Sequence, residues 1–318
     1  MASLNQLVEH SKNTRKGNLA LELQSIIKNS IRNNRKLVKV GSLEHSNLKT
    51  SQALNELVLE KVISDYRFEN LISSIAIKEE LQFLIEEHNR IAQLTSLGLP
   101  VSNKILLHGP SGCGKTLASY VIAGELKKPM YVINLGAVVS SKLGETSKNL
   151  AKIFRQASAE ESIIFMDEFD SIGKLRDYNQ DHGEMKRVVN TILQLMDYLP
   201  QKSLVICATN QIDMIDDALK RRFDMNLKFE KPNEKEIQEL IKLTLKSGKF
   251  YFDTPRSQIA LIKSAIGLSY YSIQKTLITA IKRSLFRRNE SNEIPISTII
   301  DTELWKDLMK KEKEALKL

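Results

Sequence analysis

Cysteine, aromatic residues and long apolar runs are all scarce in this sequence of 318 residues. The two cysteines, Cys113 and Cys207, are far apart and show no CxxC spacing, so neither a disulfide framework nor a cysteine-ligated zinc site is indicated. Their apolar or glycine-rich surroundings favour packing residues over nucleophiles. No apolar run approaches the roughly 18 to 20 residues that cross a bilayer. Residues 1–16 lack the apolar core of a secretory signal, and we therefore expect a cytoplasmic protein without a membrane partner.

Positive charge is concentrated near the N-terminus. The formal net charge is +9, and residues 1–50 hold nine lysines and arginines against three glutamates. A basic surface can meet nucleic acid, an acidic protein or only water. No aromatic residue precedes Tyr66, so the stacking side chains that bind single-stranded nucleic acid are lacking there. We therefore favour a solvated or protein-facing surface over a DNA-binding one.

The chain divides into three regions by its hydrophobic pattern. With 42% hydrophobic residues it can bury a sizeable core, and its length suits about two ordinary domains. Apolar residues at helix spacing between 19 and 31, and a second stretch over 50–63, predict a small helical N-terminal region at residues 1–66. Residues 232–318 contain several helix patterns and no convincing strand, which predicts a helical C-terminal lid.

Between these regions, residues 67–231 alternate helices with short apolar strands. Near-continuous apolar strands are typical of a parallel sheet that is covered on both faces. One intervening helix carries a stripe at i, i+3, i+4 and i+7, formed by Leu150, Ile153, Phe154 and Ala157. The alternation predicts a doubly wound, parallel five-stranded α/β sheet. Its expected strands are 104–108, 130–134, 163–166, 204–208 and 225–229.

The segment Gly109-Pro110-Ser111-Gly112-Cys113-Gly114-Lys115-Thr116 matches the GxxxxGK[ST] phosphate-binding loop, and Leu117 follows it. An expected strand precedes the segment and a helix-compatible run follows it, which is the context that this motif requires. Glycines let the backbone N–H groups face phosphates, and the helix N-terminus adds partial positive charge. Lys115 would reach the β- and γ-phosphates of ATP, and Thr116 would place its hydroxyl on Mg²⁺.

A second element of the expected site, which is acidic, lies fifty residues downstream of the phosphate loop. The apolar strand at 163–166 delivers Asp167 and Glu168 to the carboxyl edge of the sheet, where ligands bind in open α/β folds. Asp167 would hold Mg²⁺, usually through water. Glu168 would polarise the attacking water as a general base. Together with the phosphate loop, this pair predicts a Mg²⁺-dependent ATPase.

The sequence resembles a AAA+ ATPase of the classical AAA clade over about residues 70–280. The resemblance rests on the two elements above and on further segments in the family's order, which are Asp167 to Ile172 followed by Arg176, Ala208-Thr209-Asn210, Ala218 to Asp224, and Gly267-Leu268-Ser269. It implies a homo-oligomer that forms a ring, which in this family is commonly a hexamer. It also implies that Asn210 orients the attacking water or the γ-phosphate, and that Arg221 and Arg222 reach the neighbouring subunit's nucleotide. Either arginine could be the dominant one.

Three departures from the family pattern concern substrate and nucleotide contacts. Lys142 stands where polypeptide-translocating relatives carry an aromatic residue in the central pore loop. Ser269-Tyr270-Tyr271 replaces the common Ser-Gly-Ala of the lid, so that two tyrosines could reshape the adenosine wall or stack on the base. The usual start of the nucleotide-contacting linker is not recognisable over 70–77.

The resemblance favours an ATPase that remodels or regulates a protein client, including a separately encoded effector such as a protease. The chain itself has no HExxH or GxSxG motif with which to cut a peptide. The alternative is a nucleic-acid motor or loader, which draws on the net charge, on Lys142 and on the basic stretch 282–288. A third reading, a nucleotide-gated switch with little turnover, is opposed by the presence of both Lys115 and Glu168.

Overall fold

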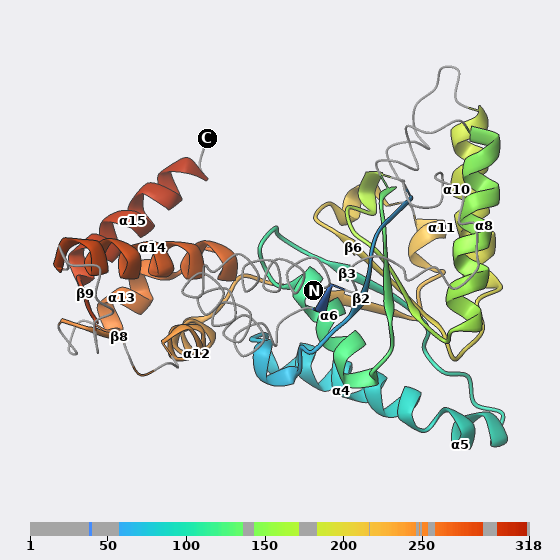
Figure 1. Cartoon of the computed structure of the whole chain (residues 1–318), viewed down its shortest axis with the longest axis horizontal. Helices are drawn as coiled ribbons and strands as arrows, with labels where there is room; N and C mark the ends of the chain where they lie inside the picture. The colour runs from blue at the N-terminus through green and yellow to red at the C-terminus, as the bar shows by residue number, and fades with distance from the viewer. Residues whose placement is uncertain are drawn as a thin grey trace, which may run out of the picture.

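The structure, a computed structural model, describes residues 38–39, 57–135, 143–171, 183–215, 217–245, 248, 250–253, 258–288 and 298–316 (Figure 1). A sheet with helices on its faces forms the larger lobe, and a helical lobe lies beside it. In the described part of the chain, no helix is both long and apolar enough to span a membrane. The boundary between the two lobes near residue 231 stays a prediction.

The central sheet has seven strands in the order β1-β2-β4-β5-β6-β3-β7. Its five parallel strands coincide with the five that the sequence predicts. They are β3 (Lys104–His108), β4 (Met130–Ile133), β5 (Ile163–Met166), β6 (Leu204–Thr209) and β7 (Met225–Lys228). Because β3 lies between β6 and β7 while β5 flanks β6, the carboxyl ends of β3, β5 and β6 meet at one edge.

Successive residues of these strands point to opposite faces, as the pleat requires. Ile105 and Leu107 belong to one core with α4 and α6, whereas Leu106 belongs to a second core with α8 and α10. The helices of the two faces are α4 (Ile75–Asn89) with α6 (Lys115–Leu126), and α8 (Leu143–Ala159) with α10 (Gly183–Asp197). The predicted stripe on α8 is fully buried in the second core. The expected doubly wound arrangement is therefore confirmed.

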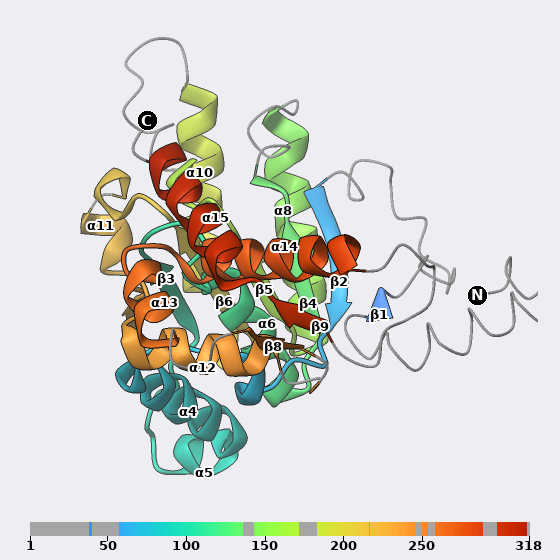
Figure 2. The ribbon, with the colours of Figure 1, turned by 90° about the vertical axis from the view of Figure 1, so that its left-hand side faces the viewer.

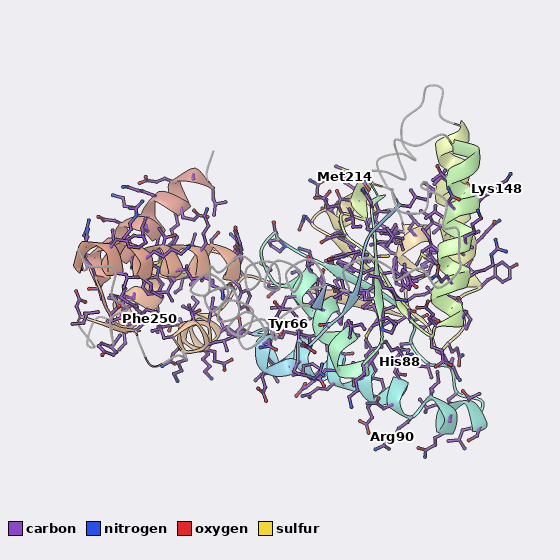
Figure 3. The ribbon with its side chains drawn as sticks, in the orientation of Figure 1. Tyr66, His88, Arg90, Lys148, Met214 and Phe250 are labelled. Atoms are coloured by element: carbon purple, nitrogen blue, oxygen red, sulfur yellow. The ribbon has the colours of Figure 1, made fainter. Side chains whose placement is uncertain are left out.

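Shorter elements complete this lobe. They are η1 (Phe68–Asn70), α5 (Ile91–Ser96), η2 (Ile212–Met214) and α11 (Asp217–Lys220). In Figure 3 the side chains crowd both faces of the sheet, while Lys148 extends outward from α8.

The structure differs from the sequence prediction at residues 58–63. They form a strand, β2 (Val58–Ile63), antiparallel to β4, and β1 (Val38–Lys39) pairs with its other side. The predicted helix is wrong there because the β-branched residues Val58, Val62 and Ile63 suit a pleated surface, and pairing satisfies the backbone groups of the β4 edge. The other N-terminal helices that we predicted lie outside the described residues.

The predicted helical lid is present. It consists of α12 (Glu234–Thr244), α13 (Gln258–Ala265), α14 (Tyr270–Arg288) and α15 (Thr302–Ala315), and Figure 2 shows α14 and α15 in the foreground. A two-stranded parallel sheet that the sequence did not predict, β8 (Phe250–Phe252) with β9 (Thr298–Ile300), joins it. Trp305 is fully buried in the core of the lid. Its indole stacks on Phe252 with the ring centroids 5.5 Å apart, and its N–H donates to the hydroxyl of Thr276 at 3.2 Å.

Candidate active site

The loop between β3 and α6 adopts a conformation that requires glycine. Gly109 has φ 134°, and a Cβ there would lie 2.0 Å from the carbonyl oxygen of Phe229. Gly112 has φ 73°, and a Cβ there would lie 2.7 Å from the hydroxyl of Ser269. Larger residues would both strain the backbone and displace these neighbours. The glycines therefore allow β7 and the lid to approach the loop closely.

Lys115 places its ammonium group inside this loop. It occupies the first turn of α6, and the residue is only 6% exposed. Its Nζ donates to the carbonyl oxygens of Gly109 at 2.7 Å and Pro110 at 2.9 Å, and to Oδ1 of Asn210 at 2.7 Å. Burial lowers the pKa of Lys115, while Asp167 nearby opposes that shift. The loop thus surrounds a single cation whose partners are neutral oxygens, an arrangement that favours an anionic ligand.

Thr116 and Asp167 lie together beside Lys115. The hydroxyl of Thr116 donates to Oδ2 of Asp167 at 2.9 Å, and the backbone N–H of Glu168 donates to Oδ1 of Asp167 at 2.9 Å. Hydroxyl and carboxylate oxygens are ligands that suit Mg²⁺, which usually takes only one or two from the protein and keeps water and phosphate oxygens for the rest. The described residues contain no group of three or more His, Cys, Asp or Glu side chains placed to hold a metal ion.

Glu168 directly follows this carboxylate in a strained backbone conformation. Its φ is 53°, in the left-handed region that residues with a side chain seldom adopt. Phe169 stabilises the turn because its N–H donates to the carbonyl of Ala208 at 2.8 Å and its ring is fully buried. Such strain is concentrated at functional sites. The turn places Glu168 at the wall of the same cavity as Lys115.

A buried hydrogen bond connects the two segments that carry these groups. The hydroxyl of Thr209 donates to Oδ1 of Asp170 at 2.9 Å and accepts from the N–H of Gln211 at 3.0 Å. Asn210 lies between Thr209 and Gln211 in the chain. No role was predicted for Asp170 or Thr209, although both belong to the segments that resemble the family. Their bond links the segment that carries Glu168 to the segment that carries Asn210.

One cavity of about 540 Å³ collects most of the predicted site residues. The predicted residues that line it are Ser111, Gly112, Gly114, Lys115, Thr116, Leu117, Asp167, Glu168 and Asn210. Gly109 and Pro110 do not line it but direct their carbonyls at Lys115. Cys113 is buried in the core instead, and burial raises the pKa of its thiol, as it does for Cys207. Both cysteines are packing residues, as expected.

The other end of the cavity is largely apolar, and most of it was not predicted. Tyr270 and Tyr271, which we expected beside the adenosine, line it. The lining residues that were not predicted are Asn70, Ile72, Leu240, Leu243 and Gln274. They come from the 70–77 segment, where no family pattern was recognisable, and from two lid helices. Only the folded chain brings these three segments together, so no local spacing could reveal them.

Arg221 and Arg222 lie outside this cavity. They follow α11, and Arg221 is exposed whereas Arg222 forms an ion pair with Asp197 at the end of α10. Neither belongs to the cavity lining. Lys142 and Arg176 lie outside the described residues. Lys282 and Arg283, from the basic stretch, are exposed on α14.

Comparisons with known proteins agree with this geometry. Residues 105–231 match the family described as "ATPase family associated with various cellular activities (AAA)". An uncharacterised AAA family ATPase, y4kL of Sinorhizobium fredii, is 34% identical over 232 residues, which are 73% of this chain and 69% of that protein. The ATP-dependent zinc metalloprotease FtsH of Mesomycoplasma conjunctivae is 32% identical over 207 residues, 63% of this chain but only 28% of the relative.

A solved structure shows the same fold. The crystal structure of the FIGL-1 AAA domain superposes with a TM-score of 0.67 and 20% identity, covering 85% of this chain and 92% of that one. The same domain has also been solved in complex with ADP, with a TM-score of 0.64. The phosphate loop, the acidic turn, the fold and the similarity over most of a relative's length lead to one conclusion. This chain belongs to the AAA family and is an ATP-hydrolysing enzyme.

Proposed function

We propose that this chain is the subunit of a ring, a hexamer, that uses Mg²⁺-dependent ATP hydrolysis to remodel or regulate a protein client. The observation that carries the enzymatic part is the convergence of Lys115, Thr116, Asp167, Glu168 and Asn210 on one cavity. The ring and the client are supported by membership of the AAA family, whose members typically oligomerise and act on proteins.

Each residue has a distinct task in the proposed reaction. Lys115 exchanges its bonds with neutral oxygens for the β- and γ-phosphates of ATP. Thr116 and Asp167 would hold Mg²⁺, which neutralises charge on the phosphate oxygens. Glu168 accepts a proton from the attacking water, and Asn210 orients that water without competing for its proton. The hydrogen bond between Thr209 and Asp170 keeps Asn210 and Glu168 in register.

Arg221 and Arg222 are proposed to act on the neighbouring subunit's nucleotide. They do not line the cavity of their own chain, so a role within that subunit is not supported. A guanidinium suits the charge that develops during phosphoryl transfer, because it presents several donors in a rigid plane. In the described residues Arg222 is already paired with Asp197, so that contact would have to open on assembly.

The client is proposed to be a protein. It could be a separately encoded effector such as a protease. The relative FtsH is named a metalloprotease, but this chain spans only 28% of its length, and the sequence contains no HExxH motif. Lys142 would contact the client through polar rather than aromatic groups if its loop faces the centre of the ring.

Steady-state phosphate release tests the enzymatic part, and cross-linking of the wild type with and without ATP tests the ring. We expect Mg²⁺-dependent turnover that rises with protein concentration as subunits assemble. The hydrolysis-blocked Glu168→Gln variant, which should hold ATP and client together, then serves to isolate the client. Turnover without Mg²⁺, or a strictly monomeric enzyme with concentration-independent turnover, would contradict the proposal.

A further inference from the structure

The lid begins α14 with two adjacent tyrosines that line the apolar end of the cavity. Their environments differ sharply. Tyr270 is 9% exposed and packs in the core, whereas Tyr271 is 63% exposed.

Tyr270 is committed to holding the lid together. Its hydroxyl donates to Oε2 of Glu236 at 2.8 Å, and this carboxylate also accepts from the backbone N–H and the side-chain amide of Asn233 at 2.9 Å each. Burial raises the pKa of Tyr270, and its bond to Glu236 adds to that shift, so the phenol stays a donor. The bond fixes the start of α14 to the first turn of α12. Tyr270 therefore forms a fixed part of the wall and cannot turn toward a ligand.

Tyr271 is anchored only through its backbone. Its N–H donates to the carbonyl oxygen of Gly112 at 3.1 Å, which ties the residue to the phosphate loop. A Cβ added to Gly112 would lie 3.0 Å from the Cβ of Tyr271, so the two backbones are in close contact. Among the described residues, none forms a hydrogen bond with the hydroxyl of Tyr271. Tyr271 thus lines the cavity while 63% of the residue stays exposed. Contact of its ring with water carries a free-energy cost that a flat apolar ligand would relieve.

The lining of the cavity suits a ligand with one charged end and one apolar end. Its phosphate end presents Lys115, Thr116 and Asp167, whereas Ile72, Leu240 and Leu243 line the other end. A nucleoside triphosphate has both a charged tail and a planar, largely apolar base. We propose that Tyr271 binds the base of ATP by stacking its ring on it, while Tyr270 fixes the lid wall from which Tyr271 projects. This inference rests on the proposed ATP site.

Calorimetric titration of ATP and of inorganic triphosphate separates base contact from phosphate contact. Tyr271→Ala should weaken ATP binding by about 5- to 100-fold, the usual range for losing one aromatic stack on a base. Its affinity for inorganic triphosphate should stay at the wild-type value. Tyr271→Phe should bind ATP like the wild type, because the ring is kept, whereas Tyr271→Leu should resemble the alanine variant. Tyr251→Ala is the matched control, because Tyr251 is also an exposed lid tyrosine but does not line the cavity.

A fluorescent variant provides a second measurement that does not depend on affinity. Tyr271→Trp should have its emission changed by ATP and not by inorganic triphosphate, whereas the buried Trp305 of the parent should respond little to either. The proposal is overturned if Tyr271→Ala binds ATP normally, if it loses triphosphate affinity equally, or if Tyr271→Leu matches Tyr271→Phe. Lys115→Ala tests the underlying site independently: retained affinity for both ligands in that variant would overturn the phosphate site rather than the stacking.

Discussion

The ammonium group of Lys115 lies 2.7 Å from the side-chain oxygen of Asn210, and this contact joins the first turn of α6 to the end of β6. The carboxyl ends of β3, β5 and β6 meet at one edge of the sheet, so Thr116 and Asp167 are brought to within 2.9 Å in the same place. The cation, the paired oxygens and the amide therefore come from three segments that are far apart in the chain, at residues 115–116, 167 and 210. Each of the contacts can be tested by a single substitution.

Lys115→Ala should abolish measurable ATP binding. The substitution deletes the charge that would face the β- and γ-phosphates, and charge-assisted hydrogen bonds of this kind support a loss of about 10²-fold or more. Calorimetric titration measures the affinity. Lys152→Ala, which removes an exposed lysine from α8, is the control and should bind normally. Unchanged affinity in Lys115→Ala would refute the assignment of the phosphate loop.

Glu168→Gln should retain ATP and slow its hydrolysis by about 10²-fold or more, the usual scale for losing a general base. The amide keeps the shape of the side chain but cannot take the proton from water. Phosphate release gives the rate, and binding of ATP shows that the site is intact. The matched control is Glu79→Gln on the exposed face of α4. If turnover of Glu168→Gln equals that of the wild type, another residue activates the water.

Residues 163–170 illustrate how much of this site the sequence could predict. The apolar run at 163–166 indicates a buried strand, and the acidic pair that follows it must then reach the carboxyl edge of the sheet. That inference needs only local pattern. The strained turn at Glu168 and the bond between Asp170 and Thr209 depend on a partner segment about forty residues away, which no local pattern specifies.

The apolar end of the cavity and the edge of the sheet were harder to predict for the same reason. Ile72 and Leu240 have no chemistry of their own and gain a role only when the lid and the 70–77 segment meet. The strand β2 was mistaken for a helix because its short apolar run fits both periods, and only pairing with β4 decides between them. Likewise β8 and β9, three residues each, are too short for a period to be recognised.

Thr209→Val should reduce both stability and turnover. The substitution preserves the shape of the side chain but leaves a buried carboxylate oxygen of Asp170 and the N–H of Gln211 without the hydroxyl, at a cost of about 1–3 kcal/mol in the free energy of unfolding. A shift of the adjacent Asn210 should lower kcat by about 10- to 100-fold while ATP affinity changes little. Denaturant unfolding and phosphate release measure the two effects.

Thr209→Ser is the control for this hydrogen bond, because it keeps the hydroxyl and removes only a methyl group. It should restore most of the turnover that Thr209→Val loses. If both variants lose stability but keep the wild-type kcat, the bond between Thr209 and Asp170 supports the fold without positioning Asn210.

Mixing two inactive variants should recover activity if the arginines act between subunits. Arg221 and Arg222 do not line their own cavity, and an arginine supplied by a neighbour contributes about 10³- to 10⁵-fold in rate in well-studied nucleotide hydrolases. Glu168→Gln and Arg222→Ala should therefore each be nearly inactive alone. In mixed assemblies, some interfaces pair an intact Glu168 of one subunit with an intact Arg222 of the next. Phosphate release from the exchanged mixture should exceed that of either variant alone.

The neighbouring Lys220 provides the matched control for this experiment, because it is a cation on the same segment that pairs with Asp217. Lys220→Ala should turn over ATP like the wild type. Repeating the experiment with Arg221→Ala in place of Arg222→Ala shows which arginine dominates. Only the variant that lacks the essential guanidinium should be inactive alone and regain phosphate release when it is mixed with Glu168→Gln. An absence of recovery in both mixtures, although cross-linking shows that the variants co-assemble, would mean that neither arginine completes a neighbour's site. The arginines would then have to act within their own subunit, which their position outside the cavity makes difficult, or have no part in hydrolysis.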